Sequence, residues 1–370
     1  MMNLPVRYRT SRLLLIVGYL VLAYFLYFPG YVPSLNNTGF LGIINKVVIV
    51  TLILMSFRQF FYLFFSACEE VRRESLPKEL GASEMHPISI IVPAHNEEIV
   101  IADTIYALQM LAYPKFEVIV VDDGSSDATF ANAEKASGGD PRIRVLSKAN
   151  GGKALALNHG IAHAKHDFVF CMDADSHLEA NALQFGMRHF KDPEVVGVAG
   201  AVLILNRTNL LTNFQTVEYL TGLNFYKSAQ SFLGMVTIVP GPAGLFRKAD
   251  VEVCAGYEAD TYAEDFDLTL KLLSSRGKIV YEPYMEVKTE VPEKIPALLQ
   301  QRYRWNRGIL QVLRKQFHRL RREDGVSFSL MLIAYISFEA LVIPLVNVFV
   351  PVGALVYQLR FLDFSFWLFV

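Results

Sequence analysis

The apolar residues of this chain gather in long runs near its two ends. Residues 13–28 are almost all apolar, residues 41–68 form a second run that a few polar side chains interrupt, and residues 328–357 form a third. A helix needs about 20 apolar residues to cross a bilayer. We expect two transmembrane helices within residues 1–70 and more within residues 326–370, where an apolar run at 364–370 indicates a span that the given sequence does not complete. A signal peptide would explain the first run alone, but no small-residue cleavage site follows it.

The basic residues beside these runs predict an orientation. Three arginines precede the first run at 7–12, residues 29–45 contain no Lys or Arg, and three basic residues follow the second run at 72–78. Cytoplasmic loops are enriched in Lys and Arg. We therefore expect a multi-pass protein of the plasma membrane whose N-terminus and central region face the cytoplasm. The three cysteines are widely spaced and fit that reducing compartment.

The central part of the chain, residues 86–293, follows a linker at 71–85 and alternates short apolar runs with stretches of helical periodicity. Short apolar runs bounded by polar residues are typical of buried strands. Strands that alternate with helices indicate a doubly wound, mostly parallel sheet in an α/β domain. We expect five such strands, at residues 88–92, 116–121, 143–146, 168–172 and 195–205.

Polar clusters directly follow three of these predicted strands: residues 95–97 (HNE), 122–125 (DDGS) and 173–175 (DAD). In doubly wound sheets, ligands bind outside the carboxyl ends of the strands. The three clusters therefore predict one shared binding site at that edge.

The carboxylates in these clusters each have a functional and a structural interpretation. Asp173 and Asp175 offer the oxygen ligands that Mg²⁺ or Mn²⁺ prefers, and such an ion can neutralise a diphosphate leaving group. A DxD sequence is also common in a capped turn, but its place after a buried strand favours the metal site. Asp122 and Asp123 either build a turn or accept hydrogen bonds from a nucleotide's base or ribose.

Two glycine-rich segments allow the backbone to approach a ligand closely. Residues 150–153 (NGGK) precede a helical stretch, from which Lys153 can reach a phosphate or a ribose. Residues 241–244 (GPAG) can let an acceptor pass near Gly241. An ordinary turn and an ordinary loop are the respective alternatives.

Asp265 opens a predicted helix at 266–273, directly after Glu264. It is a candidate for the general base that deprotonates an acceptor hydroxyl. A single Asp at a helix start is more often its N-cap, and the two roles are compatible.

Residues 294–322 hold nine Lys or Arg and no acid, with apolar residues at helical spacing. This pattern predicts a basic amphipathic helix on the inner membrane face, in contact with lipid. Arg304 can hold a diphosphate bidentately, and Trp305 offers a flat face for a sugar ring. Further on, Glu339 lies within a predicted span, where it either lines a glycan path or forms a hydrogen bond between helices.

The motifs together resemble those of family 2 processive glycosyltransferases, a group that includes cellulose, chitin, hyaluronan and poly-N-acetylglucosamine synthases. They occur in the family's order, and the QxxRW signature at 301–305 is the most specific. The matching segments are VPAHNEE (92–98), VDDGSSD (121–127), NGGKALALNHG (150–160), MDADS (172–176), AED (263–265) and QQRYRW (300–305).

The resemblance implies a GT-A fold, a UDP-sugar donor, a divalent metal and inversion by direct displacement. It implies catalytic roles for Asp265 and Glu264 and metal ligation by Asp175 with Asp173. The implied nucleotide site comprises Ala94, Glu97, Asp122, Asp123, Lys153 and Asp173, and the implied diphosphate and acceptor site comprises Gln301, Arg304, Trp305 and Gly241. The AED motif departs from the TED of cellulose synthases, which leaves the donor sugar open, with N-acetylglucosamine favoured.

Three functions remain in competition. A processive synthase would extend a glycan and export it through its own membrane region or with a partner protein. A lipid glycosyltransferase would add a single sugar to a membrane acceptor. A degenerate domain would serve as a scaffold of an export complex, but the intact Asp173, Asp175, Asp265 and Arg304 argue against that. With 35 basic and 36 acidic residues, the chain has no overall positive charge for nucleic acid, and we expect no such partner.

Overall fold

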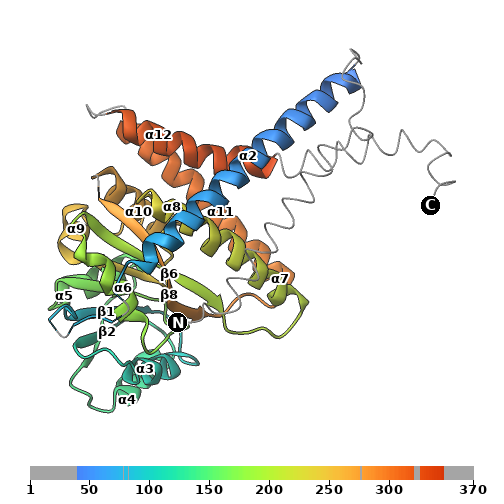
Figure 1. Ribbon diagram of the computed structural model, residues 1–370. Helices are drawn as coiled ribbons and strands as arrows, with labels where there is room; N and C mark the ends of the chain where they lie inside the picture. Colours follow the sequence, from blue (N-terminus) through green and yellow to red (C-terminus); the bar gives the residue numbers. More distant parts are fainter. Residues whose placement is uncertain (1–39, 78, 82, 276, 321–325, 346–370) are drawn as a thin grey trace. The chain divides into compact units, whose positions relative to one another are not determined.

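The computed structural model describes residues 40–77, 79–81, 83–275, 277–320 and 326–345 (Figure 1). It divides into two compact units, one of residues 65–330 and a smaller one of residues 1–64 with 331–370. The apolar runs at 13–28 and 364–370 lie outside the described residues, as does much of the run at 328–357. Within the described part, no helix combines the length and the apolarity that crossing a membrane requires.

An eight-stranded mixed sheet forms the centre of the larger unit, in the order β3-β2-β1-β4-β7-β6-β8-β5. The five predicted strands are present as β1 (Ile88–Ala94), β2 (Phe116–Asp122), β3 (Ile143–Ser147), β4 (Phe168–Cys171) and β6 (Val195–Ile204). Strands β1 to β4 run parallel to one another, and β6 runs parallel to β8. The carboxyl ends of β1, β2 and β4 therefore meet at one edge, where the polar clusters follow them.

Three further strands make the sheet mixed: β5 (Ser176–Leu178), β7 (Gly244–Arg247) and β8 (Lys278–Thr289). Strand β7 runs antiparallel between β4 and β6, and β5 runs antiparallel to β8. Residues 244–247 begin at the last residue of the glycine-rich segment 241–244, for which the sequence predicts a loop. They form a strand because Leu245 and Phe246 are buried in the middle of the sheet, although four residues are too few to show a strand period in the sequence.

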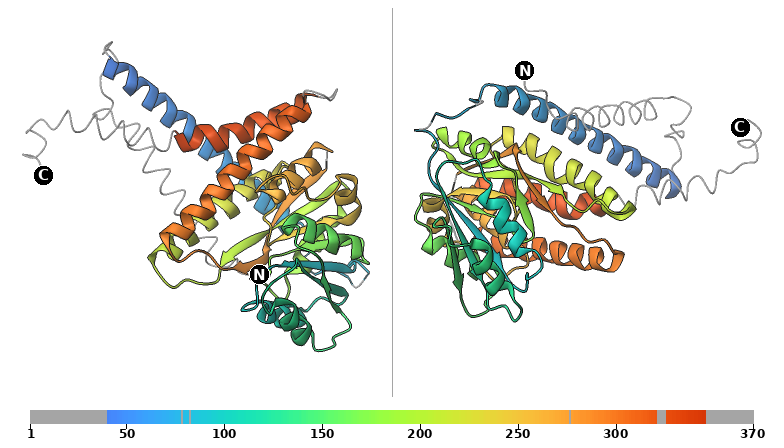
Figure 2. Two further views of the ribbon diagram at one scale, coloured as in Figure 1. Left: turned by 180° about the vertical axis from the view of Figure 1, so that it is seen from behind. Right: turned by 90° about the horizontal axis from the view of Figure 1, so that it is seen from below.

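Helices cover both faces of this sheet (Figures 1 and 2). Residues Ile88, Ile90 and Val92 of β1 share a core cluster with α3 (Ile101–Gln109), and α4 (Thr129–Ser137) packs beside α3. The opposite face of β1 meets α5 (Lys153–His163), where a Cβ on Gly160 would lie 2.4 Å from Ile91 Cγ2. Two shorter helices follow, α6 (Ala182–Met187) and the 3₁₀ helix η1 (Arg188–Lys191).

The second half of the larger unit contributes five more α-helices and one π-helical turn. They are α7 (Leu210–Glu218), the π-helix η2 (Tyr219–Phe225), α8 (Tyr226–Phe232), α9 (Lys248–Val253), α10 (Glu264–Ser274) and α11 (Ile295–Leu320). The basic amphipathic helix predicted at 294–322 is α11. Gly308 brings α11 against the start of α10, because a Cβ there would lie 2.7 Å from Ala263 Cβ.

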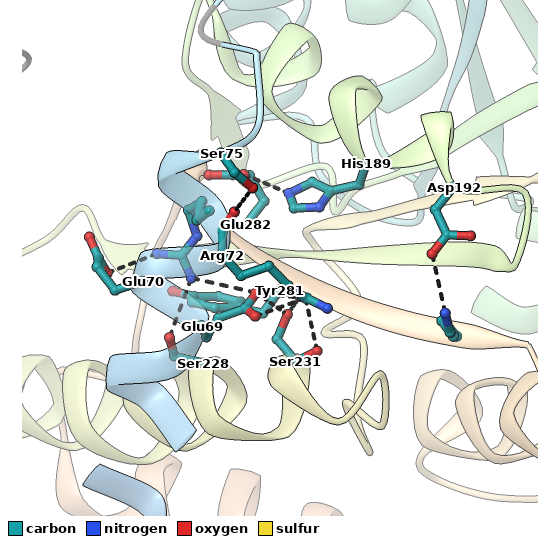
Figure 3. Close-up of polar contacts among 12 residues, drawn as sticks. Glu69, Glu70, Arg72, Ser75, His189, Asp192, Ser228, Ser231, Tyr281 and Glu282 are labelled. Carbon is teal, nitrogen blue, oxygen red and sulfur yellow. Dashed lines mark hydrogen bonds and ion pairs between the residues drawn. The ribbon is translucent and has the colours of Figure 1, made fainter. Parts of the chain in front are cut away.

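The last turns of α2 (Phe40–Glu74) belong to the larger unit, where buried polar contacts hold them (Figure 3). Glu69 is 1% exposed and accepts a hydrogen bond from Ser231 Oγ at 2.7 Å, and Arg73 donates to Ser228 Oγ at 3.3 Å. The segment expected as a linker from residue 71 is therefore helical to Glu74. Arg73 is buried in it rather than free on the surface.

In the smaller unit, Glu339 lies in the π-helical turn η3 (Phe338–Val342), which follows α12 (Val326–Ser337). Its Oε1 accepts hydrogen bonds from Arg58 Nε at 2.7 Å and from the Tyr62 hydroxyl at 3.1 Å. Of the two interpretations of Glu339, the structure contains the hydrogen bond between helices.

Candidate active site

A cavity of about 810 Å³ opens at the carboxyl ends of β1, β2 and β4. Its lining brings together residues that lie more than two hundred positions apart in the sequence, such as Ala94 and Trp305. The predicted residues in its lining are Ala94, Glu97, Asp123, Lys153, Asp173, Asp175, Gly241, Glu264, Asp265, Gln301, Arg304 and Trp305.

The paired acids after β2 separate in the structure. Asp123 lines the cavity and forms an ion pair with Lys148. Its carboxylate also accepts backbone hydrogen bonds from Gly151 at 3.0 Å and Gly152 at 2.7 Å. Burial alone would raise the pKa of Asp123, but these donors outweigh it and lower the pKa. Asp122 lies outside the lining and accepts from Ser125 N and Ser147 Oγ, so its contacts hold the turn.

Lys153 begins α5 and joins two acidic motifs. Its Nζ lies 2.5 Å from Asp173 Oδ1 and 3.6 Å from Glu264 Oε1. Burial alone would lower the pKa of Lys153, but these two carboxylates outweigh it and keep the pKa above its ordinary value. Gly241 leaves room beside this lysine, because a Cβ there would lie 3.0 Å from Lys153 Nζ.

The carboxylates around Asp175 form the more acidic side of the cavity. Burial and the charge of Asp173 raise the pKa of Asp175, and burial followed by the charges of Asp175 and Asp173 raises the pKa of Glu97. Carboxylates that repel one another in a partly buried site favour a cation between them. The residues present therefore fit a hard divalent ion held by Asp175 and Asp173.

A second acidic group, Glu258, Asp260 and Asp267, has carboxylates close enough to share an ion. Lys315 of α11 already occupies the space between them, since its Nζ lies 2.5 Å, 2.7 Å and 2.9 Å from the three carboxylates. This group therefore ties α11 to α10 and lies outside the cavity lining.

Asp265 is the second residue of α10 and not its N-cap, which is Ala263. Its Oδ2 accepts a hydrogen bond from Gly241 N at 3.1 Å, which aims the carboxylate at the cavity. Burial and the charge of Glu264 raise the pKa of Asp265 to about 6, although Lys153 acts in the opposite direction. A carboxylate with this pKa is suited to accept a proton near neutral pH.

The QxxRW residues reach the cavity from the first half of α11. Trp305 is fixed by Arg302, whose guanidinium lies 4.1 Å from the centre of the indole ring and also pairs with Glu218 at 2.7 Å. Arg304 is exposed at the lining, where it is accessible to an anionic ligand.

Sequence analysis missed Lys227, Tyr219 and Glu290, which also line the cavity. Lys227 and Tyr219 lie in or beside η2, and Glu290 follows β8 directly. Glu290 carried a usable signal, since it is an acid directly after a strand. Lys227 belongs to no recognisable motif.

Comparisons with known proteins bear on the family of this chain. The family model described as Glycosyl transferase family 2 matches residues 89–254. A poly-beta-1,6-N-acetyl-D-glucosamine synthase of Staphylococcus epidermidis is 30% identical over 312 residues, which are 83% of this chain and 75% of that protein. The chain belongs to glycosyl transferase family 2. Membership confirms family 2, whereas the processive group within it stays a prediction.

Another curated relative and two solved structures are also similar to this chain. The synthase of the same name from Staphylococcus aureus (strain COL) is 33% identical over 257 residues, or 69% of this chain, and the match spans 62% of that relative's length. Among solved structures, the mannosyltransferase PcManGT from Pyrobaculum calidifontis, in complex with GDP-Man and Mn²⁺, aligns with a TM-score of 0.62 at 21% identity, over 84% of this chain and 85% of that chain. TarS 1–349 of S. aureus, in complex with UDP-GlcNAc, aligns with a TM-score of 0.50 at 17% identity, over 68% of this chain and 73% of that chain. These two likenesses concern the fold, which is the GT-A-like α/β fold expected from the sequence.

Proposed function

We propose that this protein is an inverting, processive glycosyltransferase that transfers N-acetylglucosamine from a UDP-linked donor to a growing glycan. The observation that carries the proposal is the convergence of Asp265, the Asp173–Asp175 pair and the QxxRW residues on one cavity. The choice of sugar is supported by the relatives named as poly-β-1,6-N-acetylglucosamine synthases.

In the proposed reaction, Asp265 accepts the proton of an acceptor hydroxyl. The acceptor oxygen then forms a bond to the anomeric carbon while the bond from that carbon to the donor phosphate breaks, which inverts the anomeric configuration. The hydrogen bond from Gly241 N holds the Asp265 carboxylate in place for this step. Its pKa of about 6 leaves it ionised at neutral pH.

The departing nucleoside diphosphate needs positive charge around it. Lys153 and Arg304 reach the cavity from opposite elements, α5 and α11, and can hold the phosphate oxygens. A divalent cation held by Asp175 and Asp173 would neutralise further charge on this leaving group. Trp305 offers its ring face to a sugar of the acceptor.

We also propose that the chain is anchored in the plasma membrane through its apolar end regions, with residues 65–330 on the cytoplasmic side. UDP-sugars are available as donors on that side. The glycan can leave through the membrane region or through a partner protein. The apolar runs and the distribution of arginines in the sequence support this arrangement.

The test uses the full chain, purified in lipid nanodiscs, with radiolabelled UDP-N-acetylglucosamine and Mn²⁺ or Mg²⁺. The expected product is a labelled polymer of high molecular mass, which Asp265→Asn abolishes. Asp103→Asn is the matched control, because Asp103 is exposed on α3, away from the cavity.

A lipid-soluble product with a single sugar would replace the polymer synthase by a lipid glycosyltransferase. Binding of UDP without any transfer, in the wild-type protein and with added partner extracts, would favour a scaffold. Incorporation from another UDP-sugar alone would overturn the choice of N-acetylglucosamine.

A further inference from the structure

A lysine that the proposed reaction does not use lies in the wall of the same cavity. Lys227 is in the first turn of α8, directly after the π-helix η2, and it is 4% exposed. π-helical turns are rare and are frequent at functional sites. Lys227 lines the cavity together with Asp265 and Trp305.

The ammonium group of Lys227 is buried and finds no hydrogen-bond partner among the described residues. Leaving a charged group without partners in the interior is costly. Burial accordingly lowers the pKa of Lys227 to about 7, although the charge of Asp265 acts in the opposite direction. A buried donor with three free N–H bonds, facing a cavity, is set to receive a ligand that carries oxygen atoms.

The neighbours of Lys227 hold α8 in place from within the larger unit. Arg73 donates to Ser228 Oγ, and Ser231 Oγ donates to Glu69 and accepts from Tyr281 N at 2.8 Å (Figure 3). These contacts bind α8 to the end of α2 and to β8. A helix fixed on this side cannot turn its lysine out to water without breaking them.

The charges around Lys227 indicate which substrate it meets. Lys153, which is proposed to hold the donor diphosphate, is paired with Asp173 and Glu264. The charge of Asp265 acts on both lysines, but for Lys227 it is Asp265, and not Asp173 or Glu264, that opposes the effect of burial. Lys227 is therefore associated with Asp265, the group proposed to contact the acceptor hydroxyl.

We propose that Lys227 binds the acceptor: its ammonium group donates hydrogen bonds to oxygen atoms of the sugar at the growing end and holds that sugar's hydroxyl against Asp265. This inference rests on the proposed function and adds to it a residue for acceptor recognition. The ligand chemistry is a neutral sugar with hydroxyl or amide carbonyl oxygens.

The experiment separates acceptor binding from donor binding in the full chain in nanodiscs. The acceptor probe is the β-1,6-linked tetramer of N-acetylglucosamine, and the donor is UDP-N-acetylglucosamine. Lys227→Met is expected to raise the acceptor KM about tenfold to a hundredfold, the range for losing a hydrogen bond from a charged donor. The donor KM and the Kd for UDP, measured by calorimetry, are expected to stay within about twofold.

Two matched lysine variants accompany it. Lys153→Met is expected to do the reverse, raising the donor KM and weakening UDP binding. Lys165→Met is the neutral control, because Lys165 is 66% exposed and lies outside the cavity lining. A circular-dichroism spectrum and a melting temperature like those of the wild type show that each variant is folded. Should Lys227→Met not fold, Lys227→Gln carries the test, since glutamine keeps an N–H donor and is expected to fall between Met and the wild type.

Three outcomes would overturn the inference. An unchanged acceptor KM in Lys227→Met would remove Lys227 from acceptor binding. Weakened UDP binding with an unchanged acceptor KM would make it a ligand of the donor phosphates. A fall in kcat alone, with a displaced pH profile, would mean that it acts through Asp265.

Failure of the proposed function is distinguished by a binding measurement. If the wild-type protein transfers nothing from UDP-N-acetylglucosamine, the donor proposal fails, and binding of the tetramer is then measured by saturation-transfer NMR in the presence of UDP. Binding to the wild type but not to Lys227→Met would still support the inference. Equal binding to both, or binding to neither, would overturn it.

Discussion

At the scale of single residues, two neighbours of opposite charge shift the pKa of Asp265 in opposite directions. Glu264 precedes it in the chain and raises its pKa, whereas Lys153 lowers it. Lys153 also contacts Asp173 at 2.5 Å, so the lysine that would hold donor phosphate is electrostatically linked to the proposed base. Removing the charge of Glu264 should therefore change the pKa of Asp265 without touching its position at Gly241.

This arrangement predicts an acid limb in the pH profile. Asp265 must be ionised to accept a proton, and its pKa is about 6, so kcat/KM for the acceptor should fall as the pH drops through about 6. Glu264→Gln lowers the pKa of Asp265 and should move this limb to lower pH. The measurement is the pH profile of initial rates between about pH 5 and 8. The exposed Glu134→Gln is the control, and a limb that stays in place in Glu264→Gln would exclude Asp265 as its source.

The residues of the cavity differ in how far the sequence reveals them. Asp123, Asp173 and Asp175 could be predicted because buried strands precede them and strand ends meet at one edge. The sequence could not say which of Asp122 and Asp123 enters the cavity, since that depends on backbone hydrogen bonds from Gly151 and Gly152. Lys227 was missed because only tertiary packing buries it.

At the scale of elements, the placement of α11 depends on one glycine. Ala in place of Gly normally stabilises a helix interior, by up to about 1 kcal/mol. At Gly308 the new Cβ would lie 2.7 Å from Ala263 Cβ and 2.9 Å from Ala263 N, and Ala263 precedes Glu264 and Asp265. The backbone there cannot yield as a flexible side chain would.

We therefore expect Gly308→Ala to destabilise the protein, by about 1–3 kcal/mol as for other overpacked sites. It should also lower activity strongly, because α11 carries Gln301, Arg304 and Trp305 toward Asp265. Thermal unfolding and transfer rates check this. Asn306→Ala, at an exposed position of the same helix, should be neutral or slightly stabilising. A gain of stability in Gly308→Ala would show that α11 does not press on Ala263.

A second prediction at this scale concerns Glu282 of β8, which is fully buried. It accepts from Arg188 Nη2 at 2.6 Å and contacts His189 Nε2 at 2.7 Å. Burial alone would raise the pKa of Glu282, but His189, Arg188 and Arg73 outweigh it and lower the pKa from 4.5 to about 2. The stabilisation is therefore complete above pH 4.5 and is lost as the pH falls toward 2.

Glu282→Gln should cost about 3–5 kcal/mol, because it leaves buried cationic groups without their partner. The melting temperature of the variant should also lose most of its dependence on pH between about 2 and 4.5. Unfolding followed by circular dichroism across that range is the measurement. The control is Glu84→Gln, since Glu84 is at the surface. An equal pH dependence in Glu282→Gln and wild type would assign the acid sensitivity to other carboxylates.

The elements themselves were predicted unevenly. Buried strands at 88–92 and 116–121 were found because their apolar runs end at polar clusters. Strand β7 was not found, because four residues inside a glycine-rich segment show no period. Helix α11 was predicted from its charge, yet the ion pairs of Lys315 that attach it to α10 depend on contacts across more than 40 residues of sequence.

At the scale of the whole molecule, the basic residues beside the apolar runs predict how the chain is oriented in a membrane. The two apolar runs in residues 1–70 carry arginines at 7–12 on one side and none in residues 29–45. Arg72 and Arg73 follow the second run, and the rule counts basic residues whether or not acids pair with them. The positive-inside rule therefore continues to favour a cytoplasmic position for residues 65–330.

This orientation predicts the outcome of limited proteolysis. The full chain, expressed in a bacterial host, should remain with membranes after an alkaline carbonate wash, because the proposed transmembrane helices would lie in the hydrocarbon core. Trypsin added to intact spheroplasts should leave residues 65–330 uncut, whereas inside-out vesicles should be cut at exposed basic residues such as Lys165. Release by carbonate would exclude a transmembrane anchor. Cleavage at Lys165 in intact spheroplasts would place the cavity outside the cell, away from the nucleotide-sugar donor, and the proposed function would fail with it.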